Sequence, residues 1–357
     1  MNKTKKIATL TLPLHHNYGG LIQAYALQKF IKMNGYDTEL INIDGHSLKP
    51  FLASMAYRAK SLVLDRKKND KDKITGFAKK NIKLTKKLMS LSDWNRADIN
   101  DFDAYIVGSD QVWRADYAKN IECFYFSEIK HSEKIFISYA ASLGFDEIRY
   151  DRNSLVACSK LIKSFKAVSL RESDAVDGFC EQMGVQAQPV LDPTMLLRKE
   201  DYEGLIESNS DFCKNKIFAY ILDINNEKLD TISYVEEKLK HNAHIFNYEG
   251  GKRSMSDWLS GFKNSSFVIT DSFHGVVFSI IYRKQFIAIG NAERGLSRFT
   301  SLLTKFDLID RLIIDSKKLN EIELLNIDYS IVERKLNKEV SLSKEFLLSN
   351  LESNNEK

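Results

Sequence analysis

The sequence has 357 residues, of which 43% are hydrophobic and 28% are charged, and its formal net charge is +4. These fractions are typical of a soluble globular protein, and the length exceeds one ordinary hydrophobic core and fits two domains of common size. No apolar run approaches the length of a membrane span, so the composition excludes a protein anchored by a transmembrane helix.

Positive charge is concentrated between Lys49 and Lys87, a stretch with 13 Lys or Arg and 3 Asp or Glu. Such a block is usually a solvated helix face. The alternative is a surface for anionic lipid or a pyrophosphate-bearing acceptor, in peripheral contact with the inner membrane face. Nucleic acid is disfavoured as a partner, because the segment lacks the regular aromatic side chains on which bases stack.

The cysteines and the N-terminus indicate a cytoplasmic protein. The cysteines are widely spaced without a C-x-x-C pair, which favours reduced thiols over a disulfide framework or a cysteine zinc site: Cys123, Cys158, Cys180 and Cys213. The start "MNKTKKIATLTLPL" imitates a signal peptide, but its apolar stretch is short and leads directly into "HHNYGG". We therefore expect a buried first strand.

Short β-rich apolar runs alternate with amphipathic segments, a pattern typical of βαβ units around a parallel sheet. In the first half we expect helices over 21–35 and 173–184, a basic and mostly helical insertion at about 47–100, and a closing segment at 188–194. The expected strands of this half are 6–12, 38–43, 103–110, 134–142 and 165–173.

The second half repeats the alternation. Its expected strands are 216–223, 244–248, 267–270 and 285–291, with helices at 226–240, around Trp258, from about 275 and at 295–306. The predicted fold class is α/β, with two Rossmann-like doubly wound domains facing a cleft. We expect domains at 1–194 and 195–330, followed by a helix and polar tail at 331–357. Ligands of such sheets sit beyond the carboxyl ends of the strands.

The loop "HHNYGG" at 15–20 follows the first strand and precedes a helix. Glycines allow a ligand to approach the backbone, and a helix N-terminus favours anions. Asn17, Gly19 and Gly20 are therefore candidate binding residues, although the glycines can equally serve only the turn. At most one of the adjacent His15 and His16 is expected to point into the cleft. The spacing matches neither G-x-G-x-x-G nor a P-loop.

The segment "VGSDQVW" at 107–113 follows the third expected strand. Gly108, Ser109 and Asp110 would form a polar loop at the cleft. Asp110 either caps a following helix or contacts substrate, and capping is the more common role. Trp113 is expected in the core, with sugar stacking as the alternative.

Arg171 stands at the end of a buried strand, in "AVSLRES". Because an uncompensated buried charge is costly, this guanidinium must pair with something. Its planar fork suits a carboxylate or a phosphate of a ligand. A structural ion pair with Glu172 or Asp174 is the alternative.

In "VITDSFHGVVFS" at 268–279 a strand gives way to a helix, for which Asp271 and Ser272 are suitable N-cap residues. His274 is then expected in or near the first helical turn. The positive end of the helix dipole disfavours its protonated form until an anion binds. His274 is therefore a candidate general acid or base, or else a histidine that bonds to the cap and fills space.

Taken together, six stretches resemble the polysaccharide pyruvyl transferase family over roughly residues 7–305. They are "NYGGLIQAYALQ" (17–28), "FDAYIVGSDQVW" (102–113), "ISYAASLG" (137–144), "VSLRES" (168–173), "VLDPT" (190–194) and "TDSFHG" (270–275). The resemblance implies a two-domain fold of the glycosyltransferase-B type. It also implies transfer of the pyruvyl group of phosphoenolpyruvate onto two sugar hydroxyls, which forms a cyclic ketal and releases phosphate.

On this resemblance, Arg171 corresponds to the donor-binding arginine and His274 to the family's histidine. Ser272, Phe273, Gly275 and Arg298 are further candidate substrate-binding residues. The sequence departs from the family twice. It has Ser272-Phe273-His274 where many members have Arg-Leu-His, and Asn17-Tyr18-Gly19-Gly20 where many have Asn-x-Gly-Asp.

The resemblance implies a saccharide acceptor of a cell-surface polysaccharide, either free or carried on a lipid, and phosphoenolpyruvate as donor. No metal or further cofactor is expected. One alternative is a nucleotide-sugar glycosyltransferase on the same scaffold, in which Arg294 or Arg298 meets the pyrophosphate. A third interpretation is a non-catalytic protein that binds glycans or anions.

Overall fold

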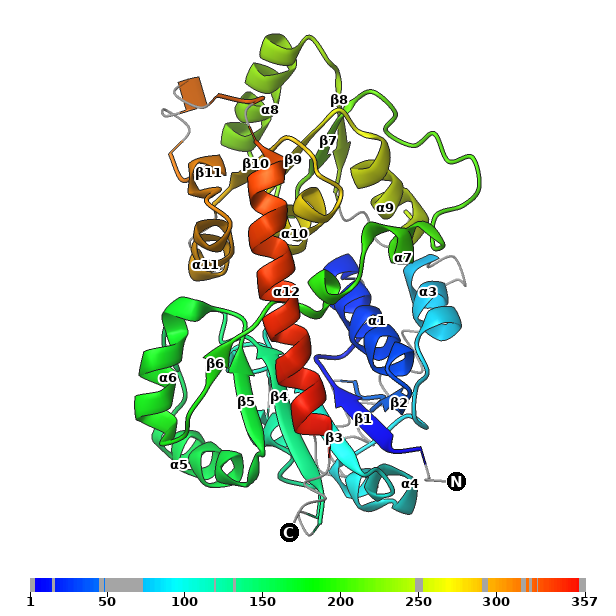
Figure 1. The fold of residues 1–357 in the computed structure, drawn as a ribbon, viewed down its shortest axis with the longest axis vertical. Helices are drawn as coiled ribbons and strands as arrows, with labels where there is room; N and C mark the ends of the chain where they lie inside the picture. The colour runs from blue at the N-terminus through cyan, green and yellow to red at the C-terminus, as the bar shows by residue number, and fades with distance from the viewer. Residues whose placement is uncertain are drawn as a thin grey trace, which may run out of the picture. The chain divides into compact units, whose positions relative to one another are not determined.

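The computed structural model divides the chain into two compact units (Figure 1). One unit holds Met1–Lys71, Thr75–Leu196 and Val340–Lys357, and the other holds Asp72–Ile74 and Leu197–Glu339. The structure describes residues 4–14, 17–44, 48, 73–118, 120–130, 133–247, 253–290, 295–315, 319–320, 323–325 and 327–352. Residues 47 and 49–72 of the expected insertion at 47–100, together with His15, His16 and Arg294, lie outside the described residues.

The first unit is built on a six-stranded parallel sheet in the order β2-β1-β3-β4-β5-β6. The five strands expected from the sequence are all present, each shorter than expected, β2 begins one residue earlier than expected, and a two-residue strand joins them. The strands are β1 (Lys6–Leu10), β2 (Asp37–Leu40), β3 (Ala104–Gly108), β4 (Ile135–Ala141), β5 (Ala167–Leu170) and β6 (Gln188–Pro189).

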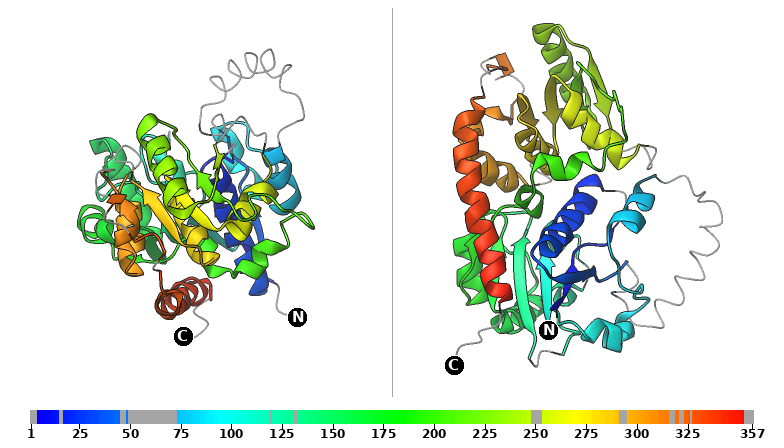
Figure 2. Two further views of the ribbon diagram at one scale, coloured as in Figure 1. Left: turned by 90° about the horizontal axis from the view of Figure 1, so that it is seen from above. Right: turned by 45° about the vertical axis from the view of Figure 1, so that its right-hand side comes forward.

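Both faces of this sheet are covered, as the continuous burial of β3 and β4 requires. On one face, Gly108 lies against Leu27 of α1 (Tyr18–Met33), and Tyr139 packs on Phe346 of α12 (Tyr329–Leu351). Figure 2 shows both helices beside this sheet. The opposite face carries an aromatic cluster, in which Trp113 stacks on Phe179.

The helices of that second face are α5 (Arg152–Leu161) and α6 (Val176–Met183), the latter preceded by a 3₁₀ turn at Ser173–Ala175. The helix expected over 173–184 is therefore present. Smaller elements complete the unit: α3 (Lys73–Asn81), α4 (Ala97–Asn100) and 3₁₀ turns at Leu91–Asn95, Ile121–Tyr125, Ile162–Ser164 and Pro193–Leu196.

The second unit has a five-stranded parallel sheet in the order β11-β10-β9-β7-β8. The strands are β7 (Ile217–Tyr220), β8 (Ala243–Phe246), β9 (Phe267–Thr270), β10 (Phe286–Ile289) and β11 (Leu312–Ile313). The first four were expected, and the two-residue β11 was not. The helices are α7 (Lys199–Glu203), α8 (Asn226–Leu239), α9 (Met255–Asn264), α10 (Phe273–Ile281) and α11 (Ser297–Lys305).

Alternate residues of β7 pack on opposite faces of this sheet, because successive side chains of a strand point to opposite sides. Ile217 and Ala219 join the aliphatic cluster that includes Val235 of α8. Phe218 and Tyr220 turn to the other face, where they pack on Phe262 of α9.

In each sheet the direction in which successive strands are added reverses once. The chain runs outward from β1 to β2 and then returns past β1 to β3, and the second unit repeats this from β7 to β8 and back to β9. In open α/β sheets the crevice at such a reversal, beyond the carboxyl ends of the two strands, is where ligands bind. The reversals lie between β1 and β3 and between β7 and β9, so the residues that follow these four strands are the ones to inspect.

Candidate functional site

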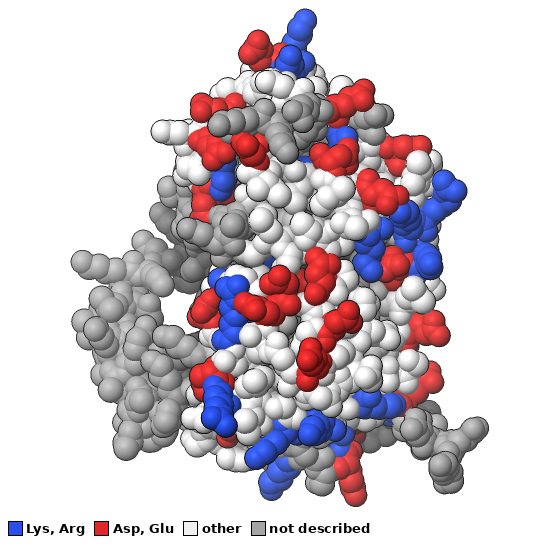
Figure 3. All heavy atoms as spheres, turned by 90° about the vertical axis from the view of Figure 1, so that its left-hand side faces the viewer, with Lys and Arg blue, Asp and Glu red and all other residues white. Residues whose placement is uncertain are grey.

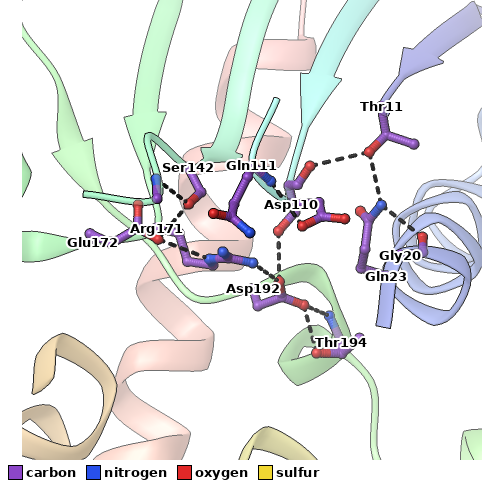
Figure 4. Close-up of polar contacts among 12 residues, drawn as sticks. Thr11, Gly20, Gln23, Asp110, Gln111, Ser142, Arg171, Glu172, Asp192 and Thr194 are labelled. Carbon is purple, nitrogen blue, oxygen red and sulfur yellow. Dashed lines mark hydrogen bonds and ion pairs between the residues drawn. The ribbon is translucent and has the colours of Figure 1, made fainter. Parts of the chain in front are cut away.

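At the reversal of the first sheet and along the same edge, polar residues from five strand ends form one network (Figure 4). Its members follow β1, β3, β4, β5 and β6, and they are Thr11, Ser109, Asp110, Ser142, Arg171, Glu172 and Asp192. All of these residues are buried. The sequence predicted polar residues at these strand ends, and in the structure hydrogen bonds and ion pairs connect them.

The N-terminus of α1 opens onto this edge. Asn17 is the extended N-cap residue, and its side chain makes no capping hydrogen bond within the described chain. Tyr18 and Gly19 are buried in the first turn. At Gly20 the carboxylate of Asp110 comes so close that a Cβ atom would stand 3.2 Å from Oδ2. Of the predicted residues, Gly20 therefore lies beside Asp110, and Asn17 lies beside Gly20.

Asp110 does not cap a helix, so the capping interpretation is wrong. Its backbone is left-handed, with φ 63°, and its Oδ1 accepts the N–H of Gln111 at 2.9 Å. Residues 111–118 form turns rather than a helix in the described chain. Trp113 is 1% exposed and stacks between Tyr125 and Phe179, so it is a core residue as expected.

Arg171 forms the ion pair that the sequence left open as an alternative, together with a second one. Nε lies 3.2 Å from Glu172 Oε1, and Nη1 lies 3.3 Å from Asp192 Oδ2. The side chain is 3% exposed. Burial disfavours its charge, but the carboxylates of Glu172, Asp192 and Asp110 outweigh burial and raise the pKa of Arg171. The guanidinium therefore keeps its positive charge beside three carboxylates.

Asp192 is the residue of this network that sequence reasoning missed. Its Oδ2 accepts from Ser109 Oγ at 2.6 Å and from Arg171, and its Oδ1 accepts from the backbone and the hydroxyl of Thr194. The signal available was its place in "VLDPT", directly after a short strand. Because Asp192 binds the loops that follow β3 and β5, it fixes the positions of both Ser109 and Arg171.

At the reversal of the second sheet, His274 occupies the first turn of α10, as predicted. Ser272 is the N-cap residue, and its Oγ accepts the N–H of Gly275 at 3.4 Å. The cap is held in turn by Thr270, whose Oγ1 accepts the N–H of Ser272 at 3.1 Å. His274 is 7% exposed, and its ring meets that of Phe273 edge-on.

Asp271 has a different role from the cap expected of it. Its carboxylate accepts the N–H of Leu222 at 2.7 Å and that of Asp223 at 3.2 Å, so it ties the end of β9 to the end of β7. Lys228 of α8 lies 2.7 Å from Asp271 Oδ2 and also donates to the carbonyl of Asp223. This buried pair holds the strand end from which His274 projects.

Gly275 is required by the packing of α10 on β9. A Cβ atom there would stand 2.1 Å from Thr270 Oγ1 and 2.8 Å from Thr270 Cβ. The missing side chain lets the first turn of the helix approach the strand, which is one of the established uses of glycine in nucleotide-binding α/β folds. Close approach of the helix explains this glycine without a ligand.

Arg298 lies in the first turn of α11, which follows β10 in the chain. It is 8% exposed, and its Nε donates to the carbonyl of Gly295 at 3.5 Å. The guanidinium also lies 5.8 Å from the ring of Phe299.

The predicted residues thus form two groups, one in each unit. Asn17, Gly19, Gly20 and Asp110 lie with Arg171 in or beside the first group. The second group contains Ser272, Phe273 and His274. The expected meeting of Arg171 and His274 at one substrate depends on the placement of the two units and stays a prediction.

Comparison with known proteins decides the family. A family model described as polysaccharide pyruvyl transferase matches residues 17–293. The chain belongs to the polysaccharide pyruvyl transferase family. The match includes both polar strand edges apart from Thr11, and the family is one of transferases that act on polysaccharide. The sequence matches no curated protein.

Two solved structures resemble this family member along nearly its whole length. UDP-N-acetylglucosamine 2-epimerase from Rickettsia bellii aligns at a TM-score of 0.55 and 11% identity, covering 98% of this chain and 96% of that chain. An alpha-glucosyltransferase in complex with UDP and a 13-mer DNA aligns at a TM-score of 0.50 and 11% identity, covering 96% and 95%. These likenesses confirm the predicted fold class, two Rossmann-like domains of the glycosyltransferase-B type.

The described surface of the transferase carries charges of both signs on the face drawn in Figure 3. None of the helices described is long and apolar enough to span a bilayer. At the described end of the basic segment, Lys83 pairs with Asp37 and Glu39, and Lys87 pairs with Asp44.

Proposed function

We propose that this transferase moves the pyruvyl group of phosphoenolpyruvate onto two hydroxyls of a saccharide, as a cyclic ketal. The observation that carries the proposal is His274, buried in the first turn of α10 at the reversal of the second sheet, within the part of the chain that matches the family. A titratable ring at a helix N-terminus combines a proton carrier with a site for an anion.

The reaction needs one proton at carbon and two new C–O bonds. Protonation of the methylene carbon of phosphoenolpyruvate leaves an oxocarbenium-like C2, which a sugar hydroxyl attacks. The C–O bond to phosphate then breaks, and a second hydroxyl closes the ring. The two acceptor hydroxyls lose two protons in total. One makes up for the proton added to the methylene carbon, and the other leaves with the released phosphate. The scheme uses no metal and no further cofactor.

His274 is our candidate for the group that delivers the proton to the methylene carbon or receives one from the hydroxyl. The donor carries a phosphate and a carboxylate, and the backbone N–H groups of the first turn of α10 favour such an anion. Ser272 and Phe273 flank the ring, and Gly275 follows it. Arg298, at the start of α11, is a second candidate for an anionic group of the donor.

Arg171 would serve donor binding in the first unit. The assignment follows the resemblance to the family's donor-binding arginine. The ion pairs of Arg171 with two carboxylates indicate that it also has a structural role. We propose that Arg171 contributes positive charge to the donor from this fixed position. A substitution that keeps the positive charge distinguishes the role in donor binding from the structural role.

The proposed acceptor is a precursor of a cell-surface polysaccharide, carried on a lipid at the inner membrane face. The basic segment from Lys49 to Lys87 supports this, because clustered lysines attract anionic lipid at low salt. The protein would then be cytoplasmic and peripheral. Binding to anionic vesicles should weaken with salt, and binding that is insensitive to salt would contradict the membrane contact.

The proposal is tested by incubating the purified full chain with phosphoenolpyruvate and a panel of free and lipid-linked saccharides. Phosphate release that depends on the acceptor, with the mass increase of a pyruvyl ketal, is the expected result. Turnover with a nucleotide sugar in place of phosphoenolpyruvate would favour a glycosyltransferase. Saccharide binding with no phosphate release across the panel would favour a non-catalytic binding protein.

A further inference from the structure

The side chain of Gln23 folds back along α1 to the reversal between β1 and β3. It is 1% exposed, and its Nε2 donates to the carbonyl of Gly20 and to Thr11 Oγ1, at 2.9 Å each. Helical side chains lean toward the N-terminus of their helix, so the carboxamide lies beside the first turn of α1.

The orientation of this carboxamide is fixed by its neighbours. Thr11 has one hydroxyl proton, which it donates to the carbonyl of Ser109 at 3.2 Å, so it can only accept from Gln23. A flipped amide would place Oε1 against the carbonyl of Gly20, which is also an acceptor. The NH₂ group therefore faces Thr11 and Gly20, and Oε1 faces away from them.

Gln23 Oε1 receives no hydrogen bond from the described residues, although it is buried. The carboxylate of Asp110 lies at the same place, since its Oδ2 stands 3.2 Å from where a Cβ of Gly20 would be. In Figure 4 the carboxamide of Gln23 and the carboxylate of Asp110 point toward one another. A buried acceptor without a donor is costly and calls for an explanation.

The charge of the surroundings says what kind of partner fits. Among the groups that act on Arg171, the carboxylates of Asp110, Glu172 and Asp192 outnumber its single guanidinium. Gln23 Oε1 and the Asp110 carboxylate are both acceptors, so an anion is disfavoured directly between these two groups, whereas the donor substrate proposed above would meet the guanidinium of Arg171. In the described chain no group of three or more acidic, histidine or cysteine side chains is placed to hold a metal ion. A neutral hydrogen-bond donor remains.

We propose that the reversal between β1 and β3 is a subsite for hydroxyl groups of the saccharide acceptor, with Gln23 Oε1 and the Asp110 carboxylate as the two acceptors. The identity of the ligand as the acceptor rests on the proposed function; binding of a neutral hydroxyl compound does not. The exposed Asn17, at the N-cap of α1, borders the same place.

The substitution Asp110→Asn tests this subsite. Asparagine tolerates the left-handed backbone of residue 110, and its Oδ1 can still accept the N–H of Gln111. Its NH₂ group can then donate to Gln23 Oε1. The variant should therefore have a Tm equal to or above that of the parent, and yet bind saccharide at least about tenfold more weakly, because both acceptors are occupied or lost.

The matched control is Asp116→Asn, the same change at an exposed carboxylate that pairs only with Arg114 among the ion pairs described. Parent, variant and control, all as the full chain, are titrated calorimetrically and melted with methyl galactoside, methyl glucoside and methyl mannoside. Magnesium chloride, ammonium chloride and inorganic phosphate are tested in parallel. We expect a saccharide to bind the parent and the control, and to bind Asp110→Asn poorly.

Four results would overturn the subsite: a lower Tm of Asp110→Asn without ligand, equal saccharide affinity in the variant, no binding of any saccharide to the parent, or stabilisation of the parent by a cation that the variant loses. Pyruvyl transfer is not needed for any of these measurements. Saccharide binding that depends on Asp110 without any phosphate release would therefore refute the proposed function and leave the subsite standing.

Discussion

Arg171 and Asp192, 21 positions apart in the chain, form an ion pair at 3.3 Å in which both side chains are almost completely buried. Removing one partner of such a pair leaves a buried charge uncompensated, which typically costs about 3–5 kcal/mol. Arg171→Ala should lower the free energy of unfolding by that amount, measured by urea denaturation.

Arg171→Lys keeps the charge and is the variant in which donor binding is tested. Lysine lacks the planar fork, so it holds only part of the geometry with Glu172 and Asp192. A folded Arg171→Lys should show a raised KM for phosphoenolpyruvate, and the KM for the saccharide should stay near the parent value. Lost stability with unchanged donor saturation would restrict Arg171 to a structural role.

His274→Ala should abolish most of the acceptor-dependent phosphate release. Loss of a general acid or base usually costs about 10²–10⁴-fold in rate. The far-UV circular dichroism of the variant should match the parent. His241→Ala is the matched control, since His241 is exposed and bonds only to Ser266 among the described contacts. Turnover of His274→Ala near that of His241→Ala would discard the catalytic role.

Gly275→Ala should destabilise the second unit, because the added methyl group meets Thr270 at 2.1 Å. Overpacking of this kind costs about 1–3 kcal/mol. The contrast is Gly178→Ala in α6, where a Cβ atom meets nothing within 4 Å and the change should be neutral or stabilise by about 0.4–1 kcal/mol. Adding Thr270→Ala should recover part of the loss at Gly275, and strict additivity would contradict the proposed clash.

Stability should fall in mild acid through His244. Burial, followed by the charges of Arg253 and Lys216, lowers the pKa of His244 from 6.5. As pH decreases below 6.5, the unfolded chain binds the proton first, so the free energy of unfolding falls until the pH passes the lower folded pKa. His244→Asn should show a smaller decline between pH 7.5 and 5.5 in urea denaturation. An equal decline in both proteins would assign the effect to other groups.

Thiol reactivity should single out Cys180. All four cysteines are free, and burial raises the pKa of Cys123 and of Cys213 to about 12 and raises that of Cys158 as well. Only Cys180 is partly exposed. Iodoacetamide at pH 8 should label Cys180 first in the native protein, and all four after denaturation. Early labelling of Cys158, which is fully buried, would contradict the packing of the first unit.

Much of the fold could be predicted because its strands are apolar runs bounded by polar residues. β1, β3, β7 and β9 all lie within their expected ranges. β11 was missed because two residues, Leu312 and Ile313, give no periodicity to detect. The helix expected after Asp110 does not form, since the left-handed backbone at that residue starts a series of turns.

The sequence predicted which residue types lie at the candidate site, but not which of these residues contact each other. The histidine at the end of β9 could be placed on its helix from the cap residues alone. Asp192 could not be assigned to Arg171 because the two follow different strands, β6 and β5, that are neighbours in the sheet. Lys228 could not be assigned to Asp271 because the packing of α8 beside the end of β9 brings them together across 43 positions of the chain. Gln23 falls within the helix expected over 21–35, and its place in a helix does not predict that its Oε1 lacks a hydrogen-bond donor among the described residues.

Helix α12 begins among the residues of the second unit and ends among those of the first, with the division after Glu339. In its last turns Ser343 accepts the N–H of Leu191, Phe346 packs on Tyr139, and the carbonyl of Leu351 accepts from Lys5. A fragment cut after Leu196 would thus lack a piece of its own interior. Expression of the N-terminal half as an independent module should require the last residues of the chain to be supplied, either fused through a linker or added as a peptide.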